Sequence, residues 1–339
     1  MSAYSPHSRI DIVNALRAFA ALYVAWGHFA GGQGRWLDWT GRYGYTGVYV
    51  FFVISGFVIP YSLYRGGYSL RNFGRFLLKR AIRLYPPYLV SIPVTILAAN
   101  VLLRPLAPSS VVHFSAGQMV YHLFFLNDLV HAPWVSVVYW TLAIEWQWYV
   151  LAALLTPLLV SRNAVLRFIP IPLFMAAYFL CTSDRIVAHT LPIFLIGVFV
   201  FQYKIGLMGR WRLLALMAVL LWSMRWPTGW VIACISAATG AVIVFVSFRN
   251  GIADFLGDVS YSVYLLHLPV GVTLVMWLAR LLPYAGYYLG LLDLVGMAAS
   301  VGAAALLYRW VEKPAQDMSS RVRWVEAGRR SQLAVAISK

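Results

Sequence analysis

Residues 43–64 read YGYTGVYVFFVISGFVIPYSLY and hold no charged side chain. A helix needs about 20 apolar residues to cross the hydrocarbon core of a bilayer, and this stretch is long enough. Along the rest of the chain, the same measure finds nine further apolar segments. We therefore expect about ten membrane-spanning helices, at 10–30, 43–64, 78–102, 138–160, 164–181, 187–203, 211–224, 229–248, 259–281 and 287–310.

The composition of the whole chain agrees with a membrane location. Hydrophobic residues make up 61% of the 339 residues and charged residues only 11%, and the mean hydropathy is +0.73. A soluble protein carries roughly 25% charged residues because its surface must be solvated. We predict an all-α polytopic membrane protein. The two cysteines, Cys181 and Cys234, lack metal-ligand spacing, so no metal site is expected.

Positive side chains are distributed unevenly between the expected loops. With ten spans and a cytoplasmic N-terminus, twenty of the 27 Lys and Arg residues fall in cytoplasmic segments and six fall outside. Cytoplasmic loops of membrane proteins are enriched in Lys and Arg, so both termini are expected to be cytoplasmic. This bias accounts for the net charge of +16 without a nucleic-acid partner. We expect a transmembrane domain over 1–315 and a basic cytoplasmic tail over 316–339, which would lie against anionic membrane lipid.

Arg17 and His28 are two of the few ionisable side chains inside the expected spans, where such groups are costly and are candidates for function. They are eleven residues apart, about three helical turns, so a helix places them on one face. Asn14 and Asp11 extend this polar line, which cannot face lipid and must line an interior cavity. A structural role for His28 is open, but the in-line arginine favours a functional one.

Four other ionisable residues leave two interpretations open. Arg80 and Arg83 share a helix face near the cytoplasm, where they could reach toward lipid headgroups or form a forked anion site. Glu145 could neutralise a buried arginine or orient a catalytic histidine. His267 is ambiguous in the same way.

These residues lie in six motifs that occur in order along the chain. At these motifs the sequence closely resembles the membrane acyltransferase-3 family, which includes bacterial O-acetyltransferases of polysaccharides, lipopolysaccharide and Nod factors. Many members have Asp where this chain has Asn14 and Tyr49, which we interpret as a sign of a different substrate branch. The motifs are RAFAALYVAWGH (17–28), GVYVFFVISGFVI (47–59), RAIR (80–83) followed by Tyr85, WTLAIEWQWY (140–149), LGDVSYSVYLLHLPV (256–270) and RWVEKP (309–314).

The resemblance implies an O-acyltransferase in the inner (cytoplasmic) membrane of a bacterium, in the stand-alone form without an appended SGNH-type hydrolase domain. Acyl-CoA, most often acetyl-CoA, would be the donor, and a hydroxyl of an extracytoplasmic or lipid-linked carbohydrate would be the acceptor, with no metal. The rival interpretation is a transporter or flippase of a glycolipid or sugar intermediate, because intramembrane charges suit that function too.

With this donor and acceptor, we hypothesise roles for individual residues. His28 would be the general base, and Glu145 and Arg17 would be its catalytic partners. The CoA donor would bind to Arg17, Arg80, Arg83 and Tyr85. The substrate would contact Trp140, His267, Tyr261 and Ser55.

Overall fold

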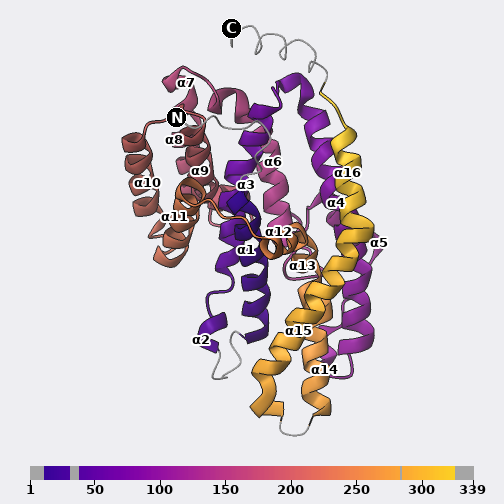
Figure 1. The fold of residues 1–339 in the computed structure, drawn as a ribbon. Helices are drawn as coiled ribbons and strands as arrows, with labels where there is room; N and C mark the ends of the chain where they lie inside the picture. Colours follow the sequence, from indigo (N-terminus) through magenta and orange to yellow (C-terminus); the bar gives the residue numbers. More distant parts are fainter. Residues whose placement is uncertain (1–10, 31–37, 283–284, 325–339) are drawn as a thin grey trace. The chain divides into compact units, whose positions relative to one another are not determined.

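The computed structural model describes residues 11–30, 38–282 and 285–324, and within these ranges every regular element is a helix (Figure 1). The long and medium helices are α1 (Asp11–Ala30), α3 (Thr46–Arg65), α4 (Phe73–Leu97), α6 (Trp140–Leu159), α8 (Pro170–Leu180), α9 (Val187–Lys204), α10 (Arg210–Met224), α11 (Trp230–Phe245) and α15 (Ala285–Leu307). The shorter ones are α2 (Asp38–Gly41), α5 (Ala116–Phe124), α7 (Ala164–Phe168), α12 (Gly251–Asp258), α13 (Ser260–Leu266), α14 (Thr273–Leu281) and α16 (Lys313–Arg321). Three π-helical segments, η2 (Ala98–Leu103), η4 (His267–Val272) and η5 (Tyr308–Glu312), and two 3₁₀ turns, η1 (Leu70–Asn72) and η3 (Pro108–Ser110), complete the described elements.

Every apolar segment found in the sequence contains helix, and six helical runs among the described residues are long and apolar enough to cross a membrane. The segments 164–180 and 230–245 are apolar but shorter. Helix α1 has 20 residues, yet it is not among the six because Asn14, Arg17 and His28 lower its hydropathy. The six runs are Asp38–Arg65, Leu70–Leu103, Trp140–Leu159, Val187–Lys204, Ser260–Leu281 and Gly290–Arg321.

Two local features explain where helices break and continue. Helix α7 ends at Phe168 and α8 begins at Pro170, because proline has no N–H to continue the hydrogen-bond ladder but fits the first turn of a new helix. At the C-terminal end, α16 already includes Gln316 and thus the start of the expected tail. Residues 325–339 of that tail lie outside the described residues.

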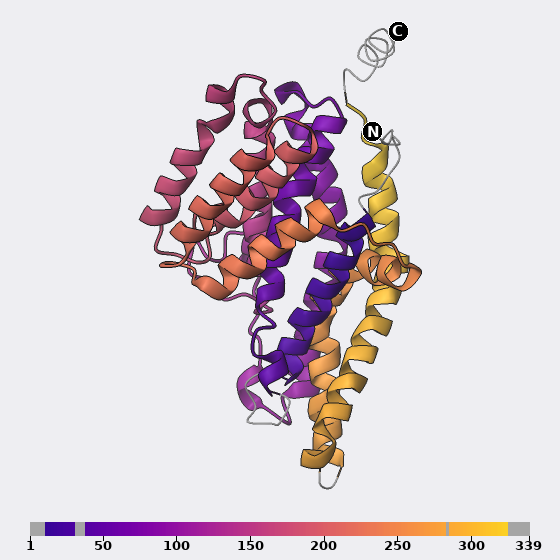
Figure 2. The same ribbon diagram turned by 60° about the vertical axis from the view of Figure 1, so that its left-hand side comes forward.

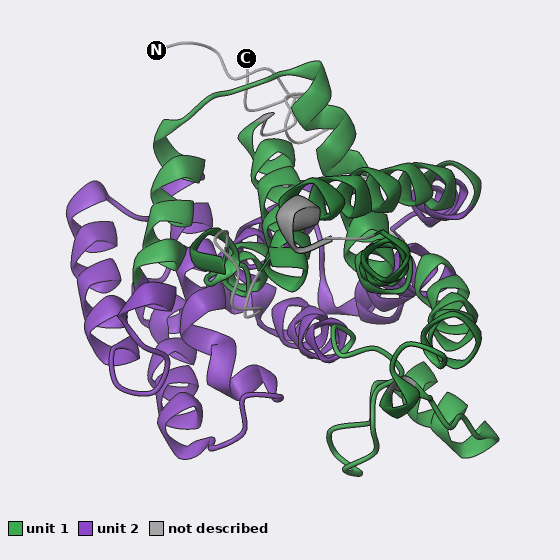
Figure 3. Ribbon diagram, turned by 90° about the horizontal axis from the view of Figure 1, so that it is seen from below, with its two compact units in different colours: residues 1–51, 87–139, 234–310 green, residues 52–86, 140–233, 311–339 purple. Residues whose placement is uncertain are grey.

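The chain divides into two compact units, each assembled from three stretches of sequence (Figure 3). Unit 1 comprises Met1–Phe51, Pro87–Tyr139 and Cys234–Trp310. Unit 2 comprises Phe52–Pro86, Trp140–Ala233 and Val311–Lys339.

In unit 1, α1 packs against α12, α13 and α15, and α14 and α15 run side by side (Figures 1 and 2). Small residues on α1 make this possible, since Ala21 and Ala25 lie in two buried apolar clusters of this unit. A Cβ atom on Gly271 would overlap the side chains of Phe29 and Ser300. Glycine at this position therefore lets η4 lie close to α1 and α15, and η4 begins with His267.

In unit 2, α9 packs against α6, α8 and α10 (Figure 1). Nearly all its side chains are buried, which explains why its sequence is apolar on every face. Helices α3 and α9 approach each other closely at Gly56 and Gly197. A Cβ atom on either glycine would overlap a backbone carbonyl of the other helix, so only glycine fits at this distance. This close approach brings Ser55 of α3 into the interior of the unit, where it is 9% exposed.

Candidate functional site

The polar face of α1 has a partner on α12 within unit 1. Because α1 runs without interruption from Asp11 to Ala30, Arg17 and His28 share one face of it. Closer to the N-terminal end of α1, the Asn14 side-chain amide donates to Asp254 Oδ1 at 3.3 Å. Asn14 thus acts as a hydrogen-bond donor, which an ionised aspartate at this position could not do.

His28 of α1 and His267 of η4 form a histidine pair in unit 1. Their ring centroids are 5.2 Å apart and the rings are tilted by 38°. The two environments differ, because His28 is exposed whereas His267 is 0% exposed. One imidazole is therefore accessible, and a second is buried directly behind it. The structure brings together two residues that the sequence analysis had selected separately.

The surroundings of His267 define its tautomer. Its Nδ1 lies 3.2 Å from the carbonyl oxygen of Val263. A carbonyl oxygen only accepts hydrogen bonds, so we assign the proton to Nδ1 and leave Nε2 as an acceptor. Nε2 is buried and has no hydrogen-bond partner among the described residues. Buried polar atoms are seldom left unpaired, so this nitrogen is suited to accept a hydrogen bond from the neighbouring His28 ring.

Tyr264 supports the histidine pair and was not selected from the sequence. Its ring lies 5.9 Å from that of His267, and its hydroxyl donates to the carbonyl oxygen of Val138 at 3.1 Å. It precedes His267 by three residues, so the helical spacing in SYSVYLLH is the signal that could have identified it. Tyr261, which was selected, lies one turn earlier on α13 and is partly exposed.

In unit 2, two hydroxyl groups hold the carboxylate of Glu145. Its Oε1 accepts from Ser55 Oγ at 3.0 Å and from the Tyr149 hydroxyl at 2.5 Å. The indole N–H of Trp148 donates to the backbone carbonyl of Ser55 at 3.3 Å, and its ring stacks on that of Phe194 with the centroids 4.5 Å apart. The sequence-selected Ser55 and Glu145 are thus in direct contact, on α3 and α6.

Arg80 joins the same group of side chains. Its guanidinium carbon lies 5.1 Å from the ring centroid of Phe76 and 5.5 Å from that of Tyr149, and Nη2 donates to Ser62 Oγ at 3.1 Å. Glu145 attracts this charge and Arg83 repels it. Tyr149 therefore contacts both Glu145 and Arg80, and we refer to the three as the Glu145–Tyr149–Arg80 network. Tyr149 was missed in the sequence, although its position four residues after Glu145 places it on the same helix face.

The remaining selected residues of unit 2 are aromatic or basic and lie near this network in sequence. Tyr85 packs edge-on against Trp146, with centroids 5.8 Å apart. Trp140 lies under the guanidinium of Arg185, which is 4.6 Å from its ring centroid. Arg83 is half-buried on α4.

Two expectations about partners and metals concern the site as a whole. Glu145 was expected to orient His28, but the two residues belong to different units, so this stays a prediction. Among the described residues, no group of three or more His, Cys, Asp or Glu side chains could hold a metal ion. The described side chains offer acid–base chemistry through imidazoles, hydrogen bonds from hydroxyls, and the positive charge of half-buried arginines.

Comparison with known proteins gives one match. The family model described as the acyltransferase domain of the acyltransferase-3 type matches residues 10–309. Searches of curated proteins and of solved structures found no match. The matched range contains the histidine pair and the Glu145–Tyr149–Arg80 network, and it ends before α16.

Proposed function

This chain belongs to the membrane acyltransferase-3 family, and we propose that it is an acyl-CoA-dependent O-acyltransferase. In this proposal it transfers an acyl group, most simply acetyl, from cytoplasmic acyl-CoA to a hydroxyl of an extracytoplasmic or lipid-linked carbohydrate. The observation that carries the proposal is the histidine pair, in which an exposed imidazole lies against a buried one whose Nε2 has no partner among the described residues.

His28 is the general base in this mechanism. Its exposed ring can be reached by a sugar hydroxyl, from which it removes the proton as the hydroxyl oxygen attacks the thioester carbonyl carbon. A carbon–oxygen bond forms, the carbon–sulfur bond breaks, and the departing thiolate takes the proton from the His28 imidazolium. The products are the O-acyl sugar and CoA.

His267 positions the reacting groups rather than carrying the proton. Val263 holds its Nδ1–H, so Nε2 presents a lone pair in a constant direction. That lone pair can accept a hydrogen bond from the N–H of His28. Because Tyr264 contacts the ring and is itself anchored to Val138, the orientation of His267 is maintained before the substrate binds.

Donor binding belongs to the arginines. Arg80 is held by two aromatic rings and by Ser62, so its guanidinium is ordered before a phosphate arrives. We assign the CoA phosphates to Arg80 and Arg83, with Tyr85 beside them, because paired guanidiniums match phosphate oxygens in charge and geometry. Arg17 would contact the donor further along its path, and Glu145 would orient His28 or stabilise its imidazolium.

The acceptor and the membrane topology complete the proposal. Trp140, Ser55, Tyr261 and His267 are the proposed acceptor contacts. We propose ten crossings of a bacterial inner membrane with both termini in the cytoplasm, which adds α1, α7–α8, α10 and α11 to the six runs that length and apolarity support. Adding these helices keeps the basic loops on one side of the membrane.

The test uses purified protein in lipid nanodiscs with acetyl-CoA and unacetylated envelope carbohydrate. We expect release of CoA thiol, incorporation of labelled acetyl into the carbohydrate, and loss of both in the His28→Ala variant. A transporter or flippase would instead move the carbohydrate across a vesicle membrane without releasing CoA. That second result would refute the proposal.

A further inference from the structure

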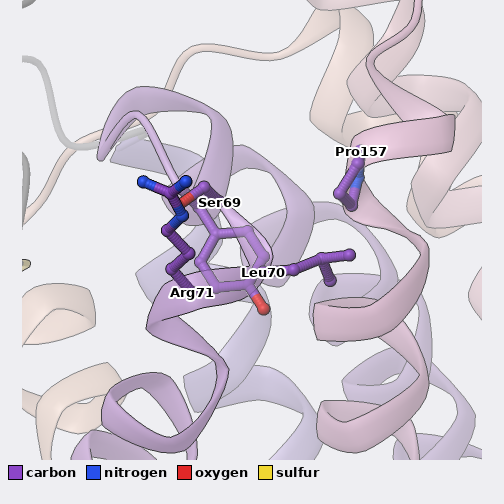
Figure 4. A pocket seen from close by; sticks show the side chains of 5 residues that line it. Ser69, Leu70, Arg71 and Pro157 are labelled. Atoms are coloured by element: carbon purple, nitrogen blue, oxygen red, sulfur yellow. The ribbon is translucent and has the colours of Figure 1, made fainter.

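A pocket of about 410 Å³ opens in unit 2 at the turn between α3 and α4. Its lining comes from four consecutive residues, 68–71, and from Pro157 of α6. Figure 4 shows Leu70 reaching toward α6, where Pro157 lies, and Ser69 and Arg71 close together on the other side. The volume falls within the range of about 300–1,000 Å³ that is usual for small-molecule sites.

The lining has two kinds of surface. The ring of Tyr68, Leu70 and Pro157 are apolar and suit a flat ring, whereas the polar atoms come from Tyr68, Ser69 and Arg71. The hydroxyl oxygens of Tyr68 and Ser69 are buried and have no hydrogen-bond partner among the described residues. Neither oxygen has appreciable surface open to the pocket, so the exposed Arg71 side chain is the lining group that can offer N–H donors and positive charge to a ligand. The pocket therefore suits a planar base that carries a phosphate.

The C-terminal segment supports the Tyr68 wall of this pocket. Trp324 packs edge-on against Tyr68 with centroids 5.8 Å apart, and Lys79 Nζ lies 5.2 Å from the centroid of the same indole. Ser319 Oγ donates to the carbonyl oxygen of Lys79 at 2.9 Å, which ties α16 to α4. A Cβ atom on Gly66 would lie 2.7 Å from Trp324 Nε1, so glycine leaves room for the indole.

A short series of contacts connects the pocket with Arg80. The ring of Tyr68 lies 6.2 Å from that of Phe76, and Phe76 lies 5.1 Å from the Arg80 guanidinium. One aromatic side chain therefore separates the pocket from the proposed phosphate site. CoA carries its 3′-phosphorylated adenosine on one side of its diphosphate and its thioester arm on the other. A donor whose diphosphate contacts Arg80 can thus place its nucleotide in this pocket.

We infer that the pocket formed by Tyr68, Ser69, Leu70, Arg71 and Pro157 binds the adenosine 3′-phosphate end of the acyl-CoA donor, with Trp324 positioning its Tyr68 wall. The inference rests on the proposed function, because it places one part of the proposed donor. Tyr68, Leu70 and Pro157 contact the base, and Arg71 contacts the phosphate.

The experiment measures the binding of CoA and of 3′-dephospho-CoA to the purified full-length protein by calorimetry. We expect Arg71→Gln to weaken CoA binding about tenfold to a hundredfold, as befits a lost charge-assisted contact. Binding of 3′-dephospho-CoA should be unchanged by this substitution, because the phosphate that Arg71 contacts is already missing. Arg65→Gln is the matched control. Arg65 lies at the end of α3 that leads into the pocket turn, with its guanidinium over the Tyr61 ring. Replacing it should leave the affinities for both ligands unchanged.

Trp324 gives a separate readout. Replacing it with Ala should weaken CoA and 3′-dephospho-CoA alike, because the base wall is shared by both ligands, and Trp324→Phe should restore most of the affinity. Equal weakening of the two ligands by Arg71→Gln, or no weakening of either, would overturn the assignment of the phosphate.

Anionic lipid is the other source of phosphate at a membrane surface, so binding is repeated in nanodiscs of phosphatidylcholine with and without phosphatidylglycerol. If Arg71→Gln alters only the dependence on phosphatidylglycerol, the pocket is a lipid headgroup site and the inference is wrong. If the wild-type protein transfers acetyl but Arg71→Gln does not distinguish the two CoA ligands, the inference fails and the proposed function stands. If the wild-type protein neither binds CoA nor transfers acetyl, both fail.

Discussion

The histidine pair of unit 1 and the Glu145–Tyr149–Arg80 network of unit 2 place polar side chains among apolar helices in opposite ways. In the network, two hydroxyls hold the Glu145 carboxylate, and two rings and a hydroxyl hold the Arg80 guanidinium. In the pair, His28 is exposed, and His267 Nε2 has no partner among the described residues. A group that must keep its charge needs partners, whereas a group that must exchange a proton needs an accessible lone pair.

The largest expected effect tests the reactive side of this comparison. His28→Ala should lower acetyl transfer by about 10²–10⁴-fold, which is the usual contribution of a general base. The melting temperature should change little, because His28 is exposed. His113→Ala is the control, since His113 is also exposed and lies outside the pair. If His28→Ala transferred acetyl at a rate within a few-fold of wild type, His28 would not be the general base.

The second effect tests the binding side. Arg80→Lys keeps a positive charge but loses the planar fork that contacts Ser62 and the two rings, so we expect the KM for acetyl-CoA to rise about tenfold or more. The value of kcat should change much less. Arg65→Lys, at the C-terminal end of α3, serves as the control. A large fall in kcat with an unchanged KM would show that Arg80 acts in the chemical step and not in donor binding, which would contradict this prediction.

A third measurement asks whether Glu145 and Tyr149 act as one group. Glu145→Leu and Tyr149→Phe should each destabilise the protein by about 1–3 kcal/mol, because each removes one side of the Tyr149–Glu145 hydrogen bond and leaves the other side without it. The double variant should be less destabilised than the sum of the two, with a coupling of about 0.5–3 kcal/mol, since they share one hydrogen bond. Additive losses in thermal unfolding would show that the shared contact carries no stability.

The smallest expected effect concerns a third histidine, which sharpens the contrast within unit 1. His122 is buried on α5 and both its nitrogens are bonded, Nε2 by the backbone N–H of Val135 at 3.4 Å and Nδ1 with the Tyr88 hydroxyl at 2.8 Å. Burial lowers the pKa of His122 to about 4. A fully bonded histidine should contribute to stability and leave acetyl transfer at neutral pH almost unchanged.

The pH dependence of this effect has a definite sign. The unfolded chain protonates His122 near pH 6.5, and the folded protein does so only near pH 4. Between these values the unfolded state binds more protons, so stability falls as the pH drops from about 6.5 to about 4. The melting temperature of His122→Gln should therefore depend less on pH over this range than that of wild type, with His113→Gln as the control. Parallel curves for wild type and His122→Gln would contradict this.

Much of the helical architecture could be predicted because its causes are local. Hydropathy marked every apolar segment that the structure shows as helix, and Pro170 marked the break between α7 and α8. Helical spacing placed Arg17 with His28 on one face of α1. The number of crossings was harder, since polar residues in α1 and the short length of α10 weaken the very signal on which the prediction depends.

Contacts within the candidate site were less accessible to prediction. Tyr149 and Tyr264 carry no charge and lie among many other aromatic residues, so only their helical spacing from Glu145 and His267 distinguishes them. The pocket at residues 68–71 involves Pro157, far away in the sequence, and the indole of Trp324 behind Tyr68. No local pattern indicates which helix lies opposite a given turn.

The sequence by itself thus determined that residues such as 43–64 form apolar helices, and its ordered motifs indicated the family, because hydropathy, helical period and motif spacing belong to short stretches of chain. Only the tertiary structure decided that His28 meets His267, that Tyr149 contacts both Glu145 and Arg80, and that Arg71 shares a pocket with Pro157. These contacts depend on how closely the helices approach one another. Small residues such as Gly271 permit a close approach, and the packing of the whole unit sets the distance.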